Sequence, residues 1–138
     1  MARLKVSSAL FGAALWILGL VLAGPASAHH SVLAVYDVNK TMTVSGTVAK
    51  VEWISPHSFI TVSVKDADGN VKKWAFETGY GALRKAGMSR ADRGGIKPGD
   101  EIVVSAAPAK DGSTNGFLRE LKLGDGRVFK FGVDENGN

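Results

Sequence analysis

The side chains best suited to chemistry in this chain are its three histidines, His29, His30 and His57. A histidine at the first position of a chain offers its free amine and its imidazole to the same metal ion, and the two together form a chelate. A third nitrogen from another histidine would complete a site of the kind that copper prefers. The three residues are therefore candidate metal ligands, with copper expected ahead of zinc if the site exists.

A simpler interpretation of these histidines also stands. His29 and His30 would then be the solvated end of a chain, and His57, next to Pro56, would only bond to the backbone at the end of a strand. The sequence does not decide between the two interpretations, because it does not say whether folding brings His57 near His29.

Chelation by the amine and imidazole of His29 requires that the mature chain begin at His29. The N-terminal residues predict a cleavage that would produce this start. Two basic residues precede an apolar run of 15 residues, 9–23, and Ala26-Ser27-Ala28 supplies the small side chains that a signal peptidase needs. Fifteen helical residues rise only about 22 Å, less than the about 30 Å of a bilayer core. We therefore expect residues 1–28 to be a cleaved signal peptide, with no membrane anchor afterwards, and a periplasmic or secreted protein. Cleavage after Ala26 would put a histidine third, which also chelates Cu(II).

Aromatic side chains around the first three predicted strands indicate a ligand surface. Trp53, Phe59 and Tyr80 are the candidate ligand-binding residues. Trp74 and Phe76 share one face of a strand and are expected in the core. Several basic residues follow, and we interpret them as a solvated face: Lys72, Lys73, Arg84, Lys85, Arg90 and Arg93.

The chain offers no recognisable catalytic constellation, so we predict no catalytic residues and a protein that is not an enzyme. Glu52 and Glu77 could each act as a lone base, but carboxylates at strand edges are more often solvated. There is no cysteine, which excludes disulfides and thiolate sites. Beyond residue 28 the chain has 15 basic and 13 acidic residues, a net charge of +2. That balance does not favour a nucleic-acid partner.

The elements that must position these residues are mainly strands, because hydrophobic residues alternate with period two. Val44 and Val48 share a face, and Val51 and Trp53 continue on the opposite parity, which predicts a β-bulge near Ala49-Lys50. Further strands are expected from 60 to 64, 71 to 77, 102 to 106, 117 to 123 and 127 to 131, with residues 117, 119, 121 and 123 on one face. A turn is expected over 66–70, and a short helix over 82–86, ended by Gly87.

Three strands, a short helix and two or three further strands are typical of a small OB-fold-like Greek-key barrel. We therefore predict an all-β fold with one short helix and five to six strands. The expected organisation is a signal peptide (1–28), an N-terminal segment (29–42), the barrel (43–132) and a disordered tail (133–138). A β-sandwich is the alternative fold, although it usually lacks a central helix.

Several motifs together resemble an exported bacterial family, the domain of unknown function 6152. They are His29-His30-Ser31, Tyr36-Asp37, Val44-Ser45-Gly46-Thr47-Val48, Val51-Glu52-Trp53, Pro56-His57, Trp74-Ala75-Phe76-Glu77, Leu83 with Ala86-Gly87, Lys97-Pro98-Gly99-Asp100 and Lys110-Asp111-Gly112-Ser113. The family usually has asparagine before the proline, where this chain has Ser55. The resemblance implies an exported all-β module, and it implies neither an activity nor a catalytic residue.

The sequence thus leads to three functional hypotheses. The first is an exported, non-enzymatic binding module that holds a small ligand or an envelope protein on the surface of its first three strands. The second is a periplasmic copper-binding protein that uses His29, His30 and His57. The third is a structural envelope module that acts through protein contacts. The oligomeric state is left open.

Overall fold

The structure is a computed structural model that describes residues 31–132. The predicted signal peptide, His29, His30 and the predicted tail lie outside the described residues. The strands are β1 (Met42–Glu52), β2 (His57–Lys65), β3 (Val71–Gly79), β4 (Glu101–Pro108), β5 (Asn115–Leu123) and β6 (Val128–Lys130). The helices are α2 (Val32–Val35), α3 (Tyr80–Lys85) and the 3₁₀ turn η1 (Ala91–Arg93).

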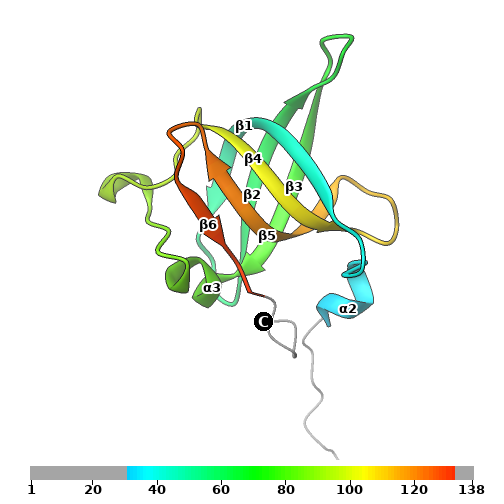
Figure 1. Ribbon diagram of the computed structural model, residues 1–138, viewed down its shortest axis with the longest axis horizontal. Helices are drawn as coiled ribbons and strands as arrows, with labels where there is room; N and C mark the ends of the chain where they lie inside the picture. Colours follow the sequence, from blue (N-terminus) through cyan, green and yellow to red (C-terminus); the bar gives the residue numbers. More distant parts are fainter. Residues whose placement is uncertain (1–30, 133–138) are drawn as a thin grey trace, which may run out of the picture.

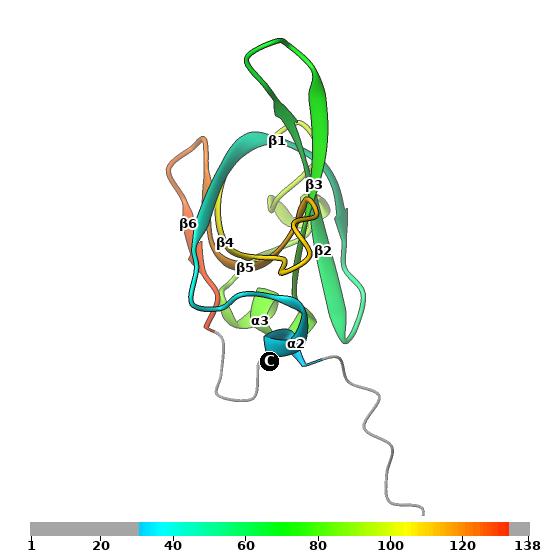
Figure 2. The same ribbon diagram turned by 90° about the vertical axis from the view of Figure 1, so that its right-hand side faces the viewer.

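Five of these strands close into a barrel, and β6 is one extra strand at its side (Figure 1). Antiparallel pairs give the order β3-β2-β1-β4-β5-β6, and a parallel pairing of β3 with β5 completes the closure. The strands curve around a common interior (Figure 2). The predicted all-β barrel of five to six strands, with a short helix after its third strand, is confirmed; the structure adds the 3₁₀ turn η1 after that helix and the helix α2 before β1. Within residues 31–132 no helix is long and apolar enough to cross a membrane.

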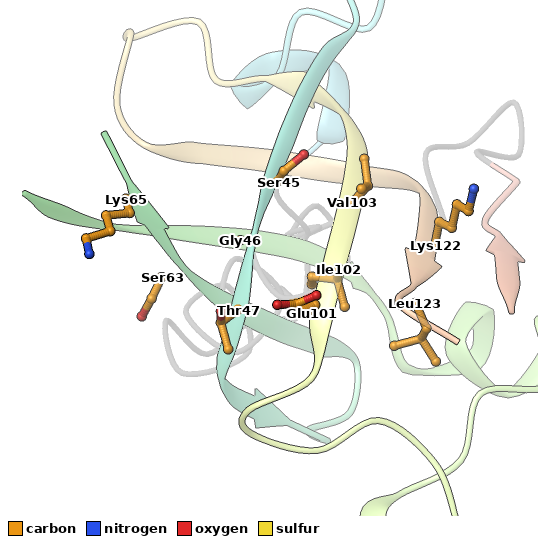
Figure 3. A pocket seen from close by; sticks show the side chains of 11 residues that line it. Ser45, Gly46, Thr47, Ser63, Lys65, Glu101, Ile102, Val103, Lys122 and Leu123 are labelled. Carbon is orange, nitrogen blue, oxygen red and sulfur yellow. The ribbon is translucent and has the colours of Figure 1, made fainter. Parts of the chain in front are cut away.

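The predicted bulge in β1 is also present. The pairing of β1 with β2 shifts register between Val48 and Lys50, so Val48 and Val51 can both turn toward the interior. Gly46, just before the bulge, lies where β1 crosses closely over β2 (Figure 3). A Cβ atom there would lie 2.4 Å from the Ser63 carbonyl oxygen, so only glycine fits without movement of the strands.

A second bulge lies in β5, and the sequence does not predict it. Because of this bulge, the prediction that residues 117, 119, 121 and 123 share one face is wrong. Ser105 pairs with Glu120 while Ala106 pairs with Leu118, so one residue of β5 has no partner in β4. The extra residue reverses the parity of the side chains. Leu118 and Leu121 therefore both enter the core, and Phe117 joins a different cluster.

Within residues 31–132, buried side chains form two separate clusters. The larger one fills the barrel, and its fully buried members include Ile60 and Val62 of β2, Phe76 of β3 and Leu83 of α3. The smaller one joins the N-terminal segment to β4 and β5: Val32, Tyr36, Ala107, Ala109 and Phe117. The segment that precedes β1 is thus attached to the barrel by apolar burial.

The central helix begins earlier than predicted. It runs from Tyr80 to Lys85 instead of over 82–86, because the chain leaves β3 at Gly79 directly into the helix. Gly87, with φ of 78°, follows its end as expected, since a left-handed conformation is easiest for glycine. Leu83 is the buried residue of this helix and closes one end of the barrel interior.

Candidate functional site

One glutamate joins the predicted metal ligand His57 to the N-terminal segment. The Nδ1 atom of His57 lies 2.5 Å from Oε1 of Glu77. The hydroxyl of Tyr36 donates a hydrogen bond of 2.6 Å to Oε2 of the same carboxylate. Both oxygens of Glu77 are therefore engaged by side chains that lie far from it in the sequence.

The pairing of β2 with β3 places two of these three residues. Glu77 lies directly opposite Phe59, and His57 lies opposite Gly79. Residues two apart on a strand point to the same side, so His57, Phe59 and Glu77 share one face. Their neighbours Ser58, Ile60 and Phe76 are buried, which makes the shared face the outer one.

The smaller apolar cluster places the third residue. Tyr36 forms an isolated antiparallel bridge with Ala109, and its ring lies 5.7 Å from that of Phe117. Phe117 is in turn the parallel partner of Glu77 across the β3–β5 seam. The tyrosine is thus held over β5 with its hydroxyl at the carboxylate.

The hydrogen-bond geometry of this triad indicates which atoms donate and which accept. Burial, and then the hydrogen bond to Glu77, raise the pKa of Tyr36 well above its ordinary value, so the phenol stays protonated and donates. A short bond between a carboxylate and Nδ1 of an imidazole is charge-assisted and favours a proton on Nδ1. In the neutral ring this leaves the lone pair on Nε2. The His57 side chain is 37% exposed and that of Glu77 is 17% exposed, so only the histidine is substantially open to solvent.

The triad does not by itself complete a metal site. Over residues 31–132 no group of three or more histidine, cysteine or acidic side chains is placed to hold a metal ion. His57 is the only one of the three predicted ligands within that range, and His30 is bonded directly to Ser31, the first described residue.

The three predicted ligand-binding aromatics lie in two places. Trp53 and Tyr80 line one cavity of about 460 Å³ beside α3, together with Arg84, Arg90 and Arg93. Phe59 is on the outer face, opposite Glu77 and Glu52. The structure therefore brings Trp53 and Tyr80 together and places Phe59 beside His57 and Glu77.

Other hollows contain neither His57 nor Glu77. One, of about 480 Å³, lies over β1 and β4 around Gly46, with Lys65, Lys122 and Glu101 among its side chains (Figure 3). Another, of about 570 Å³, lies between Pro56, the start of α3 and Lys130. Neither is lined by a histidine.

From the sequence, Glu77 is a candidate only as a lone base, and Tyr36 is not a candidate site residue. The alternation of β3 does indicate the face on which Glu77 lies, because it places Phe76 toward the core and therefore Glu77 on the opposite face. In the structure, its neighbours Phe76 and Thr78 are buried. For Tyr36 no local signal existed, since its contacts with Glu77 and Phe117 span 41 and 81 positions (117 − 36).

The model of a family of unknown function (DUF6152) matches residues 18–119, about three-quarters of the chain. The chain belongs to this family. The range matched by DUF6152 includes Tyr36, His57 and Glu77. No curated protein and no solved structure matches the chain significantly, so the specific assignment to the OB-fold stays a prediction.

Proposed function

We propose that this protein is an exported binding module that holds a Cu(II) ion. The ligands are the amine and imidazole of His29, the imidazole of His30, and Nε2 of His57, after cleavage behind Ala28. The observation that carries the proposal is the double engagement of Glu77, which fixes His57 and the N-terminal segment to the same carboxylate.

The first supporting step is the orientation of His57. Histidines that ligate metals usually donate their other ring N–H to a carboxylate, which fixes the tautomer and raises the basicity of the ligating nitrogen. Glu77 has this relation to His57, at 2.5 Å from Nδ1. Nε2 is then the ring nitrogen left to bind a metal, on a side chain that is 37% exposed.

The second step is the length of the tether. Tyr36 is anchored at Glu77, and seven positions separate it from His29 (36 − 29). Three of those steps lie within α2, which rises only about 1.5 Å per residue. His29 is therefore at most roughly 20 Å along the chain from Tyr36, whatever its conformation. A tether this short gives the two N-terminal histidines a high effective concentration at His57.

The third step is the choice of metal. The donor set is nitrogen only, and the chain has no cysteine. Amine and imidazole nitrogens suit Cu(II), which also has the highest affinity among the divalent first-row metals for such a site. An exported protein would meet copper outside the cytoplasm, where the predicted signal peptide would take it.

The test is a Cu(II) titration of the secreted protein, whose mass first establishes its N-terminal residue. We expect one copper per chain, and an affinity that falls by at least about tenfold both on His57→Ala and on acetylation of the N-terminus. Asp68→Asn, which removes an exposed carboxylate in the β2–β3 turn, is the matched control and should leave the affinity unchanged. Copper binding that is indifferent to both changes would overturn the proposal, and so would a mature chain that begins beyond His29.

A further inference from the structure

A second candidate site lies beside α3 and is lined by other side chains than those of the triad. It is the cavity of about 460 Å³ that contains Trp53 and Tyr80, and its lining includes neither His57 nor Glu77. Its apolar wall comes from the two aromatic rings and from Met88, which is buried. Its charged wall comes from Arg84, Arg90 and Arg93.

The charge of this cavity is strongly positive. None of the three arginines takes part in an ion pair among the side chains that the structure describes, and the lining residues include no carboxylate. Between Tyr80 and Ile96 the sequence has four basic residues and one acidic residue, Asp92, a net charge of +3. The guanidinium carbon of Arg90 lies 5.9 Å from the centre of the Trp53 ring, a cation–π distance.

The loop that carries Arg90 and Arg93 is held in one conformation by its backbone. The amide of Gly95 donates to the carbonyl of Arg90 at 2.9 Å, and the amide of Ile96 donates to that of Ser89 at 3.2 Å. A Cβ atom on Gly95 would lie 1.7 Å from the Ser89 carbonyl oxygen, so the two arms of the loop are in direct contact there. The arginines therefore extend from a preformed loop.

We propose that this cavity binds a small organic anion with a flat aromatic body. The carboxylate or another acidic group would bond to the guanidinium groups, because arginine presents a planar fork of donors that fits such anions. The aromatic body would pack against the rings of Trp53 and Tyr80. This site shares no lining residue with the triad, and the proposal assigns the two aromatics a ligand of defined charge and shape.

The experiment is an NMR titration of the secreted protein with 2-naphthoate, in the presence of a chelator that removes metal. We expect saturable shifts confined to the amides of Trp53, Tyr80 and residues 84–93, with a dissociation constant of about 1 mM or tighter. The neutral 2-naphthylmethanol, which has the same ring system, should bind at least about tenfold more weakly.

Two pairs of variants separate the site from general basic charge. Arg90→Gln and Arg93→Gln should each weaken 2-naphthoate binding by about fivefold or more. Lys72→Gln and Lys73→Gln remove the same charge from β3, outside the cavity, and should have no such effect. Equal affinity for 2-naphthoate and 2-naphthylmethanol would overturn the proposal. It would also be overturned if the arginine and lysine variants lost the same affinity, or if 2-naphthoate showed no saturable binding. Because the chelator is present throughout, these results do not depend on the copper proposal.

Discussion

Glu77 is the residue on which the triad depends, because each of its carboxylate oxygens has a different partner. Its place could be predicted in part. The turn over 66–70 is centred on Asp68, and the alternation of β2 and β3 about that centre puts Phe59 opposite Glu77, as observed. The contribution of Tyr36 could not be predicted, because it depends on a long-range packing contact with Phe117.

Replacing this tyrosine should change how the fold responds to alkaline pH. Burial and the Glu77 bond raise the pKa of Tyr36 above its ordinary 10.0, so the folded state holds this proton more tightly than the unfolded state does. Above about pH 10 the unfolded chain loses a proton that the folded chain keeps. The free energy of unfolding should then fall with pH, by up to about 1.4 kcal/mol per pH unit from this group.

Urea unfolding of the parent and of Tyr36→Phe, at about pH 9 and about pH 11, measures the contribution of Tyr36 to this pH dependence. We expect the variant to be less stable than the parent at about pH 9 by about 1–2 kcal/mol, since it loses the hydrogen bond. It should also lose less stability than the parent between the two alkaline pH values. An identical alkaline loss in both proteins would show that the phenol does not titrate differently on folding.

At the scale of elements, turns and regular alternation could be predicted, and irregularities only where they change the hydrophobic pattern. The β1 bulge was predictable because Val48 and Val51 change parity within one apolar strand. The β5 bulge was not, because Phe117, Leu121 and Leu123 fit a regular strand equally well. The register of β5 is decided by its pairing with β4. The hydrophobic pattern of β5 alone carries no information about that pairing.

Gly95→Ala tests the closed loop that carries Arg90 and Arg93. Because the added methyl would lie 1.7 Å from the Ser89 carbonyl, the two arms of the loop must separate, and we expect a loss of about 2–4 kcal/mol in the free energy of unfolding. Gly81→Ala is the matched control. It lies in α3 with nothing within 4 Å of the new atom, so it should stabilise by up to about 1 kcal/mol. Equal effects in urea unfolding would contradict the close contact at Gly95.

At the scale of the whole molecule, the part of the chain that the structure describes has two apolar clusters, and without cysteine the chain forms no disulfide. The barrel core lies within the predicted domain 43–132, and its hydrophobic residues were mostly identifiable from alternation. The smaller cluster crosses the predicted boundary at residue 42, because Val32 and Tyr36 pack on Phe117. Segment 31–41 therefore belongs to the folded unit, although its sequence shows no strand pattern.

Removing that segment should weaken the barrel without unfolding it. A chain that begins at Asn39 loses the buried side chains of Val32 and Tyr36, which should cost about 3 kcal/mol in the free energy of unfolding. The larger cluster stays complete, so the variant should keep its β circular dichroism and a cooperative transition. Leu33→Ser, at a position 52% exposed in the same segment, should change stability by less than about 0.5 kcal/mol. A truncated chain as stable as the parent would show that the smaller cluster contributes nothing.

The bridging carboxylate also makes two events thermodynamically reciprocal. A ligand on His57, as proposed, would act on the side chain bound to one oxygen of Glu77, and docking of the N-terminal segment acts on the other oxygen. Whatever free energy a ligand on the imidazole gains from the docked segment, the segment gains equally from the ligand. A protease that cleaves only the undocked segment would therefore report occupancy at the histidine, as a rate of cleavage that falls when the site is filled. The measurement of this cleavage rate does not require a ligand that can be detected spectroscopically.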